Sequence, residues 1–260
     1  MRYGLLLIIT GLISCGILSH DPKIDPETIP LSSIVLIDTL TDKLTLHCTD
    51  MKTTTRFYSV YMGPEKDTID INYNYDNSNS QTEFWQRFEK PNAENLSIYV
   101  DTTQLIGSAL GKKGLIPPPP PAPPTAEKEI NSWHTKEDAN WKKRIAERKA
   151  KKSYPVFIKN LSSDTLLISF GYDLPLIIEA QDSSLIWKPI QMKQTYHCGT
   201  GLHDHILGPK ELIISTCPLF RGSFKTKMRI AYQYNSDILY SNEFIGDMNY
   251  SQFDEIDLIY

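Results

Sequence analysis

The run PPPPPAPP at residues 117–124 constrains the fold of this chain more than any other segment. Each proline fixes its φ angle and lacks an amide donor, so consecutive prolines cannot continue a helix or a sheet ladder. Such a run adopts the extended polyproline II helix, which rises about 3.1 Å per residue and is semi-rigid. We therefore expect a stiff spacer over residues 117–125, with separately organised segments before and after it.

The segment after the spacer, residues 126–152, is predicted to form one charged helix. It contains no glycine or proline and many good helix formers. Trp133, Trp141 and Ile145 fall near one face at helical spacing, and the Tyr154-Pro155 that follows ends the pattern. We expect the tryptophans to dock onto a neighbouring sheet. Binding to an anionic membrane surface and a free linker are the alternatives.

Residues 153–260 are predicted to form a C-terminal β-sandwich. Short apolar or alternating runs bounded by turn residues recur through this segment. In residues 225–234 polar and apolar side chains alternate, which places four residues on one face of a strand: Met228, Ile230, Tyr232 and Tyr234. About seven short strands in roughly 108 residues match the size and strand spacing of an immunoglobulin-like sandwich.

Residues 31–116 are predicted to form a smaller N-terminal β-module. The segment 31–48 is predicted to be a hairpin, on two apolar runs within residues 33–48, SIVLIDTL and KLTLHC. The stretch at residues 58–73 aligns with residues 154–170, where a polar turn separates two apolar runs and favours a hairpin or a crossing between sheets. The fold class expected from the sequence is therefore mainly β, with two modules. They are either related to each other or alike only because turn residues and β-branched flanks are what any strand-turn-strand requires.

The first residues have the order of an export signal. A positive charge at Arg2 precedes an apolar run over residues 5–13, and then a small residue and Cys15 follow. The apolar stretch is only about ten residues, whereas a membrane-spanning helix needs roughly twenty. We therefore expect residues 1–14 to be a cleaved signal peptide and residues 15–30 to be a tether.

The motif Leu12-Ile13-Ser14-Cys15 resembles the lipobox of bacterial lipoproteins. The resemblance implies that the chain is cut before Cys15 and that its thiol carries a lipid with palmitate-type acyl chains. One acyl chain binds a membrane only marginally, and several anchor it stably. Gly16, in place of an acidic residue, implies the outer membrane and leaves its periplasmic and surface faces both open. An ordinary signal peptide with an incidental Cys15 is the alternative.

The closing stretch YSNEFIGDMNYSQF at residues 240–253 is similar to uncharacterised exported β-rich proteins. That resemblance implies no activity.

Three cysteines remain once Cys15 is assigned to lipid: Cys48, Cys198 and Cys217. An odd count in an oxidising compartment allows one disulfide and leaves one thiol. We expect Cys198 to pair with Cys217, because both lie in one predicted module and such a loop gives about 3 kcal/mol in the chain-entropy model. Two buried unpaired thiols are the alternative, since a sequence does not place Cβ atoms.

The stretch YHCGTGLHDHILGP at residues 196–209 holds the densest group of metal-type ligands. His203 and His205 are two residues apart, so both face one side of a strand, and His197 could return across a glycine-containing turn. Three histidines can hold zinc or copper. The alternative is a polar loop at the sandwich edge.

Charge and motifs narrow the expected function. The net charge of -4 gives no basic excess for nucleic acid. The chain has no Gly-x-Ser-x-Gly elbow and no phosphate-binding glycine loop. We therefore assign no catalytic residue and no cofactor, although a site of dispersed residues leaves no local pattern.

We expect a lipid-anchored envelope protein that acts as a binding or structural module. It would contact the membrane through Cys15 and an envelope protein or glycan through its loops, because binding residues concentrate on loops held by a rigid scaffold. A metal-binding protein that uses the loop from His197 to His205 is the first alternative. An envelope hydrolase is the second.

Overall fold

The computed structural model describes residues 34–40, 42, 44–52, 56–71, 88–108, 150–170, 173–192, 204–234 and 237–254. All of them belong to one compact unit, Ser32–Tyr260. The structure is 57% strand, and no helix of seven or more residues occurs in the described part. A short 3-10 helix spans Tyr250–Phe253. The mainly β class predicted from the sequence is confirmed.

The strands among these residues have the following bounds. In chain order they are β1 (Val35–Ile37), β2 (His47–Cys48), β3 (Tyr61–Pro64), β4 (Thr68–Asp70), β5 (Leu96–Val100), β6 (Ile106–Gly107), β7 (Lys152–Asn160), β8 (Leu166–Phe170), β9 (Leu176–Gln181), β10 (Trp187–Pro189), β11 (Asp204–Leu207), β12 (Glu211–Pro218), β13 (Phe220–Arg221), β14 (Phe224–Tyr234), β15 (Asp237–Tyr240) and β16 (Phe244–Met248).

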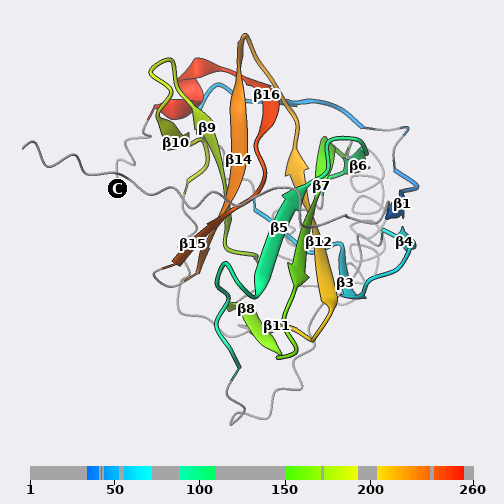
Figure 1. Ribbon diagram of the computed structural model, residues 1–260. Coiled ribbons are helices and arrows are strands. Elements are labelled where there is room, and N and C mark those ends of the chain that lie inside the picture. Colours follow the sequence, from blue (N-terminus) through cyan, green and yellow to red (C-terminus); the bar gives the residue numbers. More distant parts are fainter. Residues whose placement is uncertain are drawn as a thin grey trace, which may run out of the picture. The chain divides into compact units, whose positions relative to one another are not determined.

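One antiparallel sheet, which we call the β14 sheet, is centred on the longest strand. Its order is β10-β9-β14-β15, and β16 also pairs with β14. The eleven residues of β14 accommodate both partners on one edge, because β16 pairs with the first half of the strand and β15 with the second. Figure 1 shows β16 beside the upper part of β14 and β15 at its lower end.

The second large sheet, which we call the β7 sheet, has the order β3-β12-β7-β5, with β6 also paired to β7. In its centre Ile158 of β7 lies between Ile98 of β5 and Ile213 of β12. Strands β3 and β5 come from residues 31–116, whereas β7 and β12 come from residues 153–260. The predicted boundary between an N-terminal and a C-terminal module therefore does not separate two sheets.

The first strands pair with distant partners. β1 is parallel to β4, and β2 is parallel to β13. The hairpin predicted within residues 33–48 is therefore wrong, because a tight turn can join only antiparallel strands, and these strands use partners far along the chain. By contrast, the turn within residues 154–170 leads from β7 to β8, which pairs with β11, so this segment crosses between sheets.

The structure describes only the last residues of the segment 126–152, which was predicted to be a helix. Most of it lies outside the described residues, as do the spacer at residues 117–125 and the segments 1–14 and 15–30. Lys151, however, forms a bridge with Thr45, and Lys152 begins β7. The helix boundary at residue 152 is therefore wrong. Lys152 N donates to Thr45 O, and this partner from a distant segment holds the chain extended.

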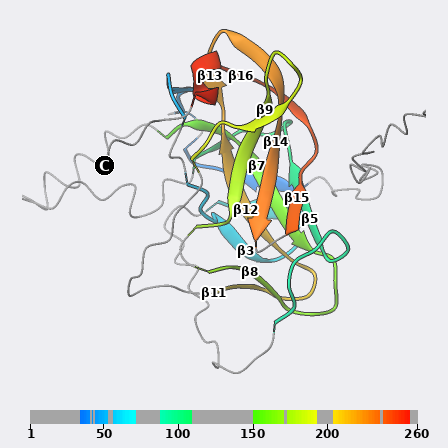
Figure 2. The ribbon, with the colours of Figure 1, turned by 90° about the vertical axis from the view of Figure 1, so that its left-hand side faces the viewer.

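The two large sheets share one apolar core. Met228, Ile230 and Tyr232 of β14 are buried in it, and the partly buried Tyr234 packs against it, which confirms the face predicted from the alternation in residues 225–234. Val156 and Ile158 of β7 are completely buried on the other side. Figure 2 looks onto β9 and β14, with β7 and β12 behind them. Burying each such isoleucine stabilises the fold by about 1.5 to 3 kcal/mol.

Amide side chains pair with backbone groups where strands lack a neighbour. Asn242 Oδ1 accepts from Val100 N at 2.7 Å, and its Nδ2 donates to Val100 O at 3.1 Å, so the segment after β15 holds an edge strand of the other sheet. Gln104 does the same for Leu36 N and Ile34 O. Because an unpaired buried backbone group costs about 1 to 3 kcal/mol, these amides stabilise the packing of neighbouring segments.

Candidate functional site

The face of the β14 sheet that points away from the core carries a polar and aromatic cluster. Side chains alternate along β14, so Arg229 lies on the face opposite Met228 and Ile230. The register places Arg229 opposite Glu179 of β9. Three neighbouring strands thus contribute side chains around Arg229, and we call Glu179, Trp187, Arg229 and Tyr240 the Arg229 cluster.

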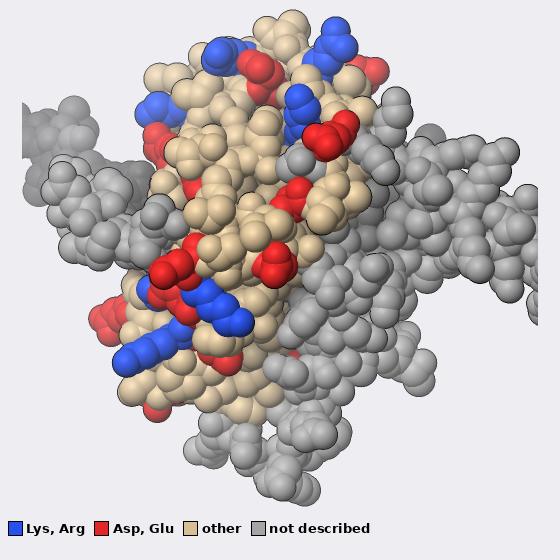
Figure 3. Space-filling model, turned by 90° about the vertical axis from the view of Figure 1, so that its right-hand side faces the viewer, with Lys and Arg blue, Asp and Glu red and all other residues tan. Residues whose placement is uncertain are grey.

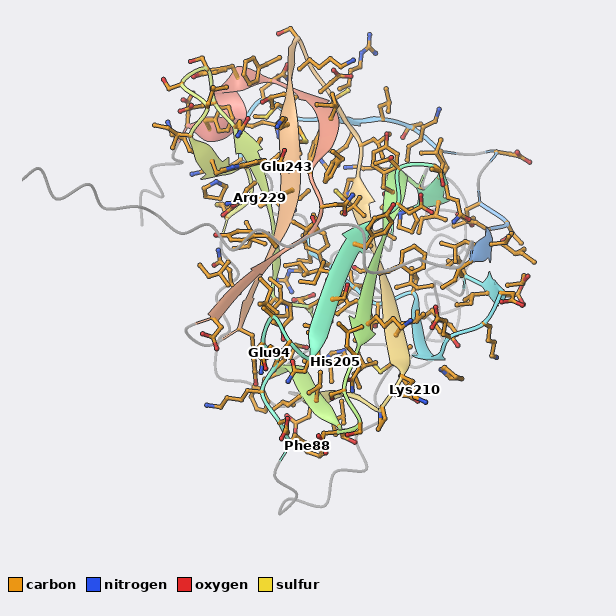
Figure 4. All side chains as sticks on the ribbon, in the orientation of Figure 1. Phe88, Glu94, His205, Lys210, Arg229 and Glu243 are labelled. Carbon is orange, nitrogen blue, oxygen red and sulfur yellow. The ribbon has the colours of Figure 1, made fainter. Side chains whose placement is uncertain are left out.

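The guanidinium group of Arg229 is held on three sides. Its Nε donates to Glu179 Oε2 at 2.9 Å, and the two side chains are only 14% and 12% exposed. Its central carbon lies 4.3 Å from the centroid of the Trp187 ring and 3.6 Å from that of Tyr240. A planar guanidinium stacks well on aromatic rings. Figure 4 shows Arg229 on β14, with Glu243 nearby above it.

This arrangement brings together residue types that are common at protein interfaces. Tryptophan, tyrosine and arginine are the residues that most often dominate the energy of protein interfaces. The salt bridge with Glu179 and the two ring contacts fix the long Arg229 side chain in advance. Binding then loses less side-chain entropy than it would with a mobile arginine. The cluster can therefore act as a rigid anchor for a partner.

Exposed isoleucines accompany the cluster on the same face. Ile245 of β16 is paired with Lys227, and Ile238 of β15 is paired with Gln233, which places both on the outer side of the sheet. They are 53% and 48% exposed. Lys227 Nζ lies 2.8 Å from Glu243 Oε2, so the charges here compensate each other. The surface is thus partly apolar and locally balanced in charge.

Charges of opposite sign also alternate on another face of the molecule. Figure 3 shows Lys and Arg side chains of the described residues next to Asp and Glu. A nucleic-acid-binding surface gathers basic side chains on one face or along one groove. The described part of this face has no such basic stripe.

The predicted metal ligands are only partly described. His197 and His203 lie outside the described residues. His205 is buried on β11, and its Nδ1 lies 2.8 Å from Ser169 Oγ on the paired strand β8. Figure 4 shows His205 in the lower part of the view, apart from Arg229. Within the described ranges, no group of three His, Cys, Asp or Glu side chains could hold a metal ion.

Of the three cysteines with a predicted role, only Cys217 lies among the described residues. Cys217 lies in β12 and is buried in the core, an environment that raises the pKa of a thiol. Cys198 and the lipid-attachment residue Cys15 both lie outside the described residues. The pairing of Cys198 with Cys217 stays a prediction.

Sequence reasoning did not find the Arg229 cluster. The alternation in residues 225–234 placed Arg229 on the face opposite the core, and that was the only signal. Glu179, Trp187 and Tyr240 reach it from β9, β10 and β15, and their positions depend on how these strands pair. No local sequence pattern indicates which residues of these strands lie opposite one another.

Comparisons with protein-family models, with curated proteins and with solved structures find no match to this chain. The described residues contain no helix of the length and hydropathy needed to cross a membrane. Fold and site define a mainly β protein that carries a preorganised aromatic and arginine cluster on an outer sheet face.

Proposed function

We propose that this chain is a lipid-anchored envelope protein, held at the outer membrane through Cys15, that binds a protein partner with the outer face of the β14 sheet. The observation that carries the proposal is the Arg229 guanidinium stacked between Trp187 and Tyr240. Interfaces between proteins are enriched in these residue types and depleted of uncompensated charge at their centre. The exposed Ile238 and Ile245 favour a polypeptide over a glycan, because aliphatic side chains gain free energy by burial against apolar surface.

We also propose that the two large sheets form a sandwich of the immunoglobulin-like type. Their antiparallel pairing and their shared apolar core support this assignment. The sequence predicted a sandwich within residues 153–260 alone. Three strands of the β7 sheet, β3, β5 and β6, instead precede the proline spacer. The sandwich that we propose therefore contains strands from both sides of the spacer, and the spacer belongs to the connection between β6 and β7.

The anchor is tested by replacing the lipid-attachment residue, Cys15→Ala. We expect the wild-type protein to carry the mass of acyl chains on Cys15 and to sediment with membranes. The variant should be unprocessed or soluble, because lipid attachment requires the thiol. Intact mass and membrane fractionation of the native protein measure both effects. Equal mass and equal fractionation of the two proteins would mean that the resemblance to a lipobox is incidental.

The binding face is tested by photo-crosslinking in the bacterium that makes the protein, with a benzophenone amino acid in place of Ile245. We expect one discrete adduct that contains a second polypeptide. Trp187→Ala should lower its yield about tenfold or more, because loss of an aromatic anchor at an interface costs at least about 2 kcal/mol. Val35→Ala, an exposed position on β1, is the matched control and should leave the yield unchanged.

Two results would contradict the proposed binding face. One is an adduct whose yield Trp187→Ala leaves unchanged while the variant keeps the circular dichroism spectrum of the wild type. The other is an adduct whose added mass is carbohydrate, which would make a glycan the ligand.

A further inference from the structure

A second cluster, distinct from the Arg229 cluster, joins a lysine to an imidazole. Lys151 Nζ lies 2.6 Å from His47 Nδ1 and 3.4 Å from His47 Nε2. The His47 ring packs edge-on against Phe220, with ring centroids 5.2 Å apart and an interplanar angle of 64°. The imidazole is therefore positioned by an aromatic ring and by the lysine.

The backbone around both residues is fixed by partners from several segments. β2 pairs with β13 so that His47 stands opposite Phe220. Ser108 N donates to Lys151 O at 2.7 Å, and Lys151 N donates to Ser108 Oγ at 3.2 Å. These bonds fix the main chain at both residues, so the two side chains start from fixed positions.

The surroundings lower the pKa values of both groups. Burial, and then the charge of Lys151, lower the pKa of His47 to about 4, so the imidazole is neutral at pH 7 and can accept a hydrogen bond from the Lys151 amine. Burial also lowers the pKa of the Lys151 ammonium, against a smaller opposing effect from Cys48. A desolvated lysine holds more of the neutral amine, which is its nucleophilic form.

We propose that Lys151 is a nucleophilic amine that captures a small aldehyde or ketone as an imine, with His47 as its proton-transfer partner. The neutral Nζ attacks the carbonyl carbon and forms a C–N bond, and the carbonyl oxygen takes up a proton to give a carbinolamine. Loss of the remaining Nζ proton and of the hydroxyl group as water leaves the C=N bond. His47 relays these protons, and no group is oxidised or reduced.

Both side chains are partly exposed, so a small carbonyl compound can reach them. The same contact could instead serve only to satisfy a half-buried ammonium with a hydrogen bond. The two roles differ in reactivity, since a purely structural lysine reacts no faster than an exposed one.

The test uses acetaldehyde with sodium cyanoborohydride at pH 7 on the full chain, followed by peptide mass mapping at low conversion. We expect Lys151 to be ethylated several-fold faster than the exposed Lys225, because a lowered lysine pKa leaves more of the side chain as neutral amine at pH 7. In concentrated urea the two rates should become equal, since unfolding removes the burial.

The part played by His47 is tested with His47→Gln, which keeps a hydrogen-bond acceptor but cannot relay protons. We expect a several-fold slower reaction at Lys151, with the rate at Lys225 and the thermal midpoint unchanged. Cys48→Ser should not slow the Lys151 reaction, because it removes the smaller effect that opposes the lowering of the Lys151 pKa.

Equal rates at Lys151 and Lys225 in the folded protein would overturn the proposal. Selective labelling of Lys151 that is unaffected by His47→Gln would overturn the proton-transfer role of His47. Both results are independent of binding at the Arg229 cluster.

Discussion

Replacing Ile158 with alanine is expected to lower the free energy of unfolding by about 3 to 4 kcal/mol. Ile158 is completely buried in the middle of β7. Strands pair with β7 on both sides, with Ile98 and Ile213 in register with Ile158, so the backbone cannot move in to fill the cavity. Urea denaturation followed by circular dichroism measures the change.

The matched control is Ile186→Ala, in the turn between β9 and β10. This side chain is 57% exposed, and its truncation should change the free energy of unfolding by less than about 0.5 kcal/mol. Equal losses in the two variants would mean that Ile158 does not lie in the core.

Replacing Gly222 with alanine is expected to cost about 3 kcal/mol or more, because the added Cβ overpacks a site lined by backbone. That Cβ would overlap the carbonyl carbon and oxygen of Met248 and the amide nitrogen of Asn249. These atoms cannot rotate away, and Met248 is paired with Phe224 in the β14 sheet. The end of β16 must therefore shift, and the thermal midpoint should fall by roughly 6 to 12 °C.

Gly246→Ala is the matched control, because here the added Cβ meets a side chain and not the backbone. Its Cβ would lie 2.6 Å from Met228 Sδ, in a flexible side chain that can change rotamer. We expect a loss of about 1 kcal/mol, measured by the same thermal melt. A loss as large as that of Gly222→Ala would show that side-chain and backbone obstruction are equally costly here.

The parts of the fold that the sequence predicted are local ones. Polar and apolar residues alternate from 225 to 234, and the structure buries Met228, Ile230 and Tyr232 on one face as expected. The turn within residues 154–170 was expected to be a hairpin or a crossing, and it is a crossing. These predictions succeeded because the two-residue period of a strand is a property of neighbouring residues.

The parts that failed depend on partners far along the chain. Residues 33–48 were expected to close a hairpin, but β1 pairs with β4 and β2 with β13. Lys151 and Lys152 have the composition of a helix end, yet Lys152 is bonded to Thr45 and extended. Local propensity is a weak preference that tertiary hydrogen bonds override.

The candidate sites also divide into those that a local sequence pattern indicates and those that depend on contacts between distant segments. The lipobox ending at Cys15, the loop with His197 and His203, and the pairing of Cys198 stay predictions, because they lie outside the described residues. The Arg229 cluster and the contact between Lys151 and His47 had no sequence motif. Each joins residues from several strands, so it exists only once those strands are in register.

By itself, the sequence determined that this protein is built of short strands and which side of β14 enters the core, because alternation along one strand is enough to state both. Only the tertiary structure decided that residues from both sides of the proline spacer share the β7 sheet. It also decided that Arg229 meets Glu179, Trp187 and Tyr240. Strand pairing is set by hydrogen bonds and apolar contacts between residues far apart in the chain, and no local pattern encodes those contacts.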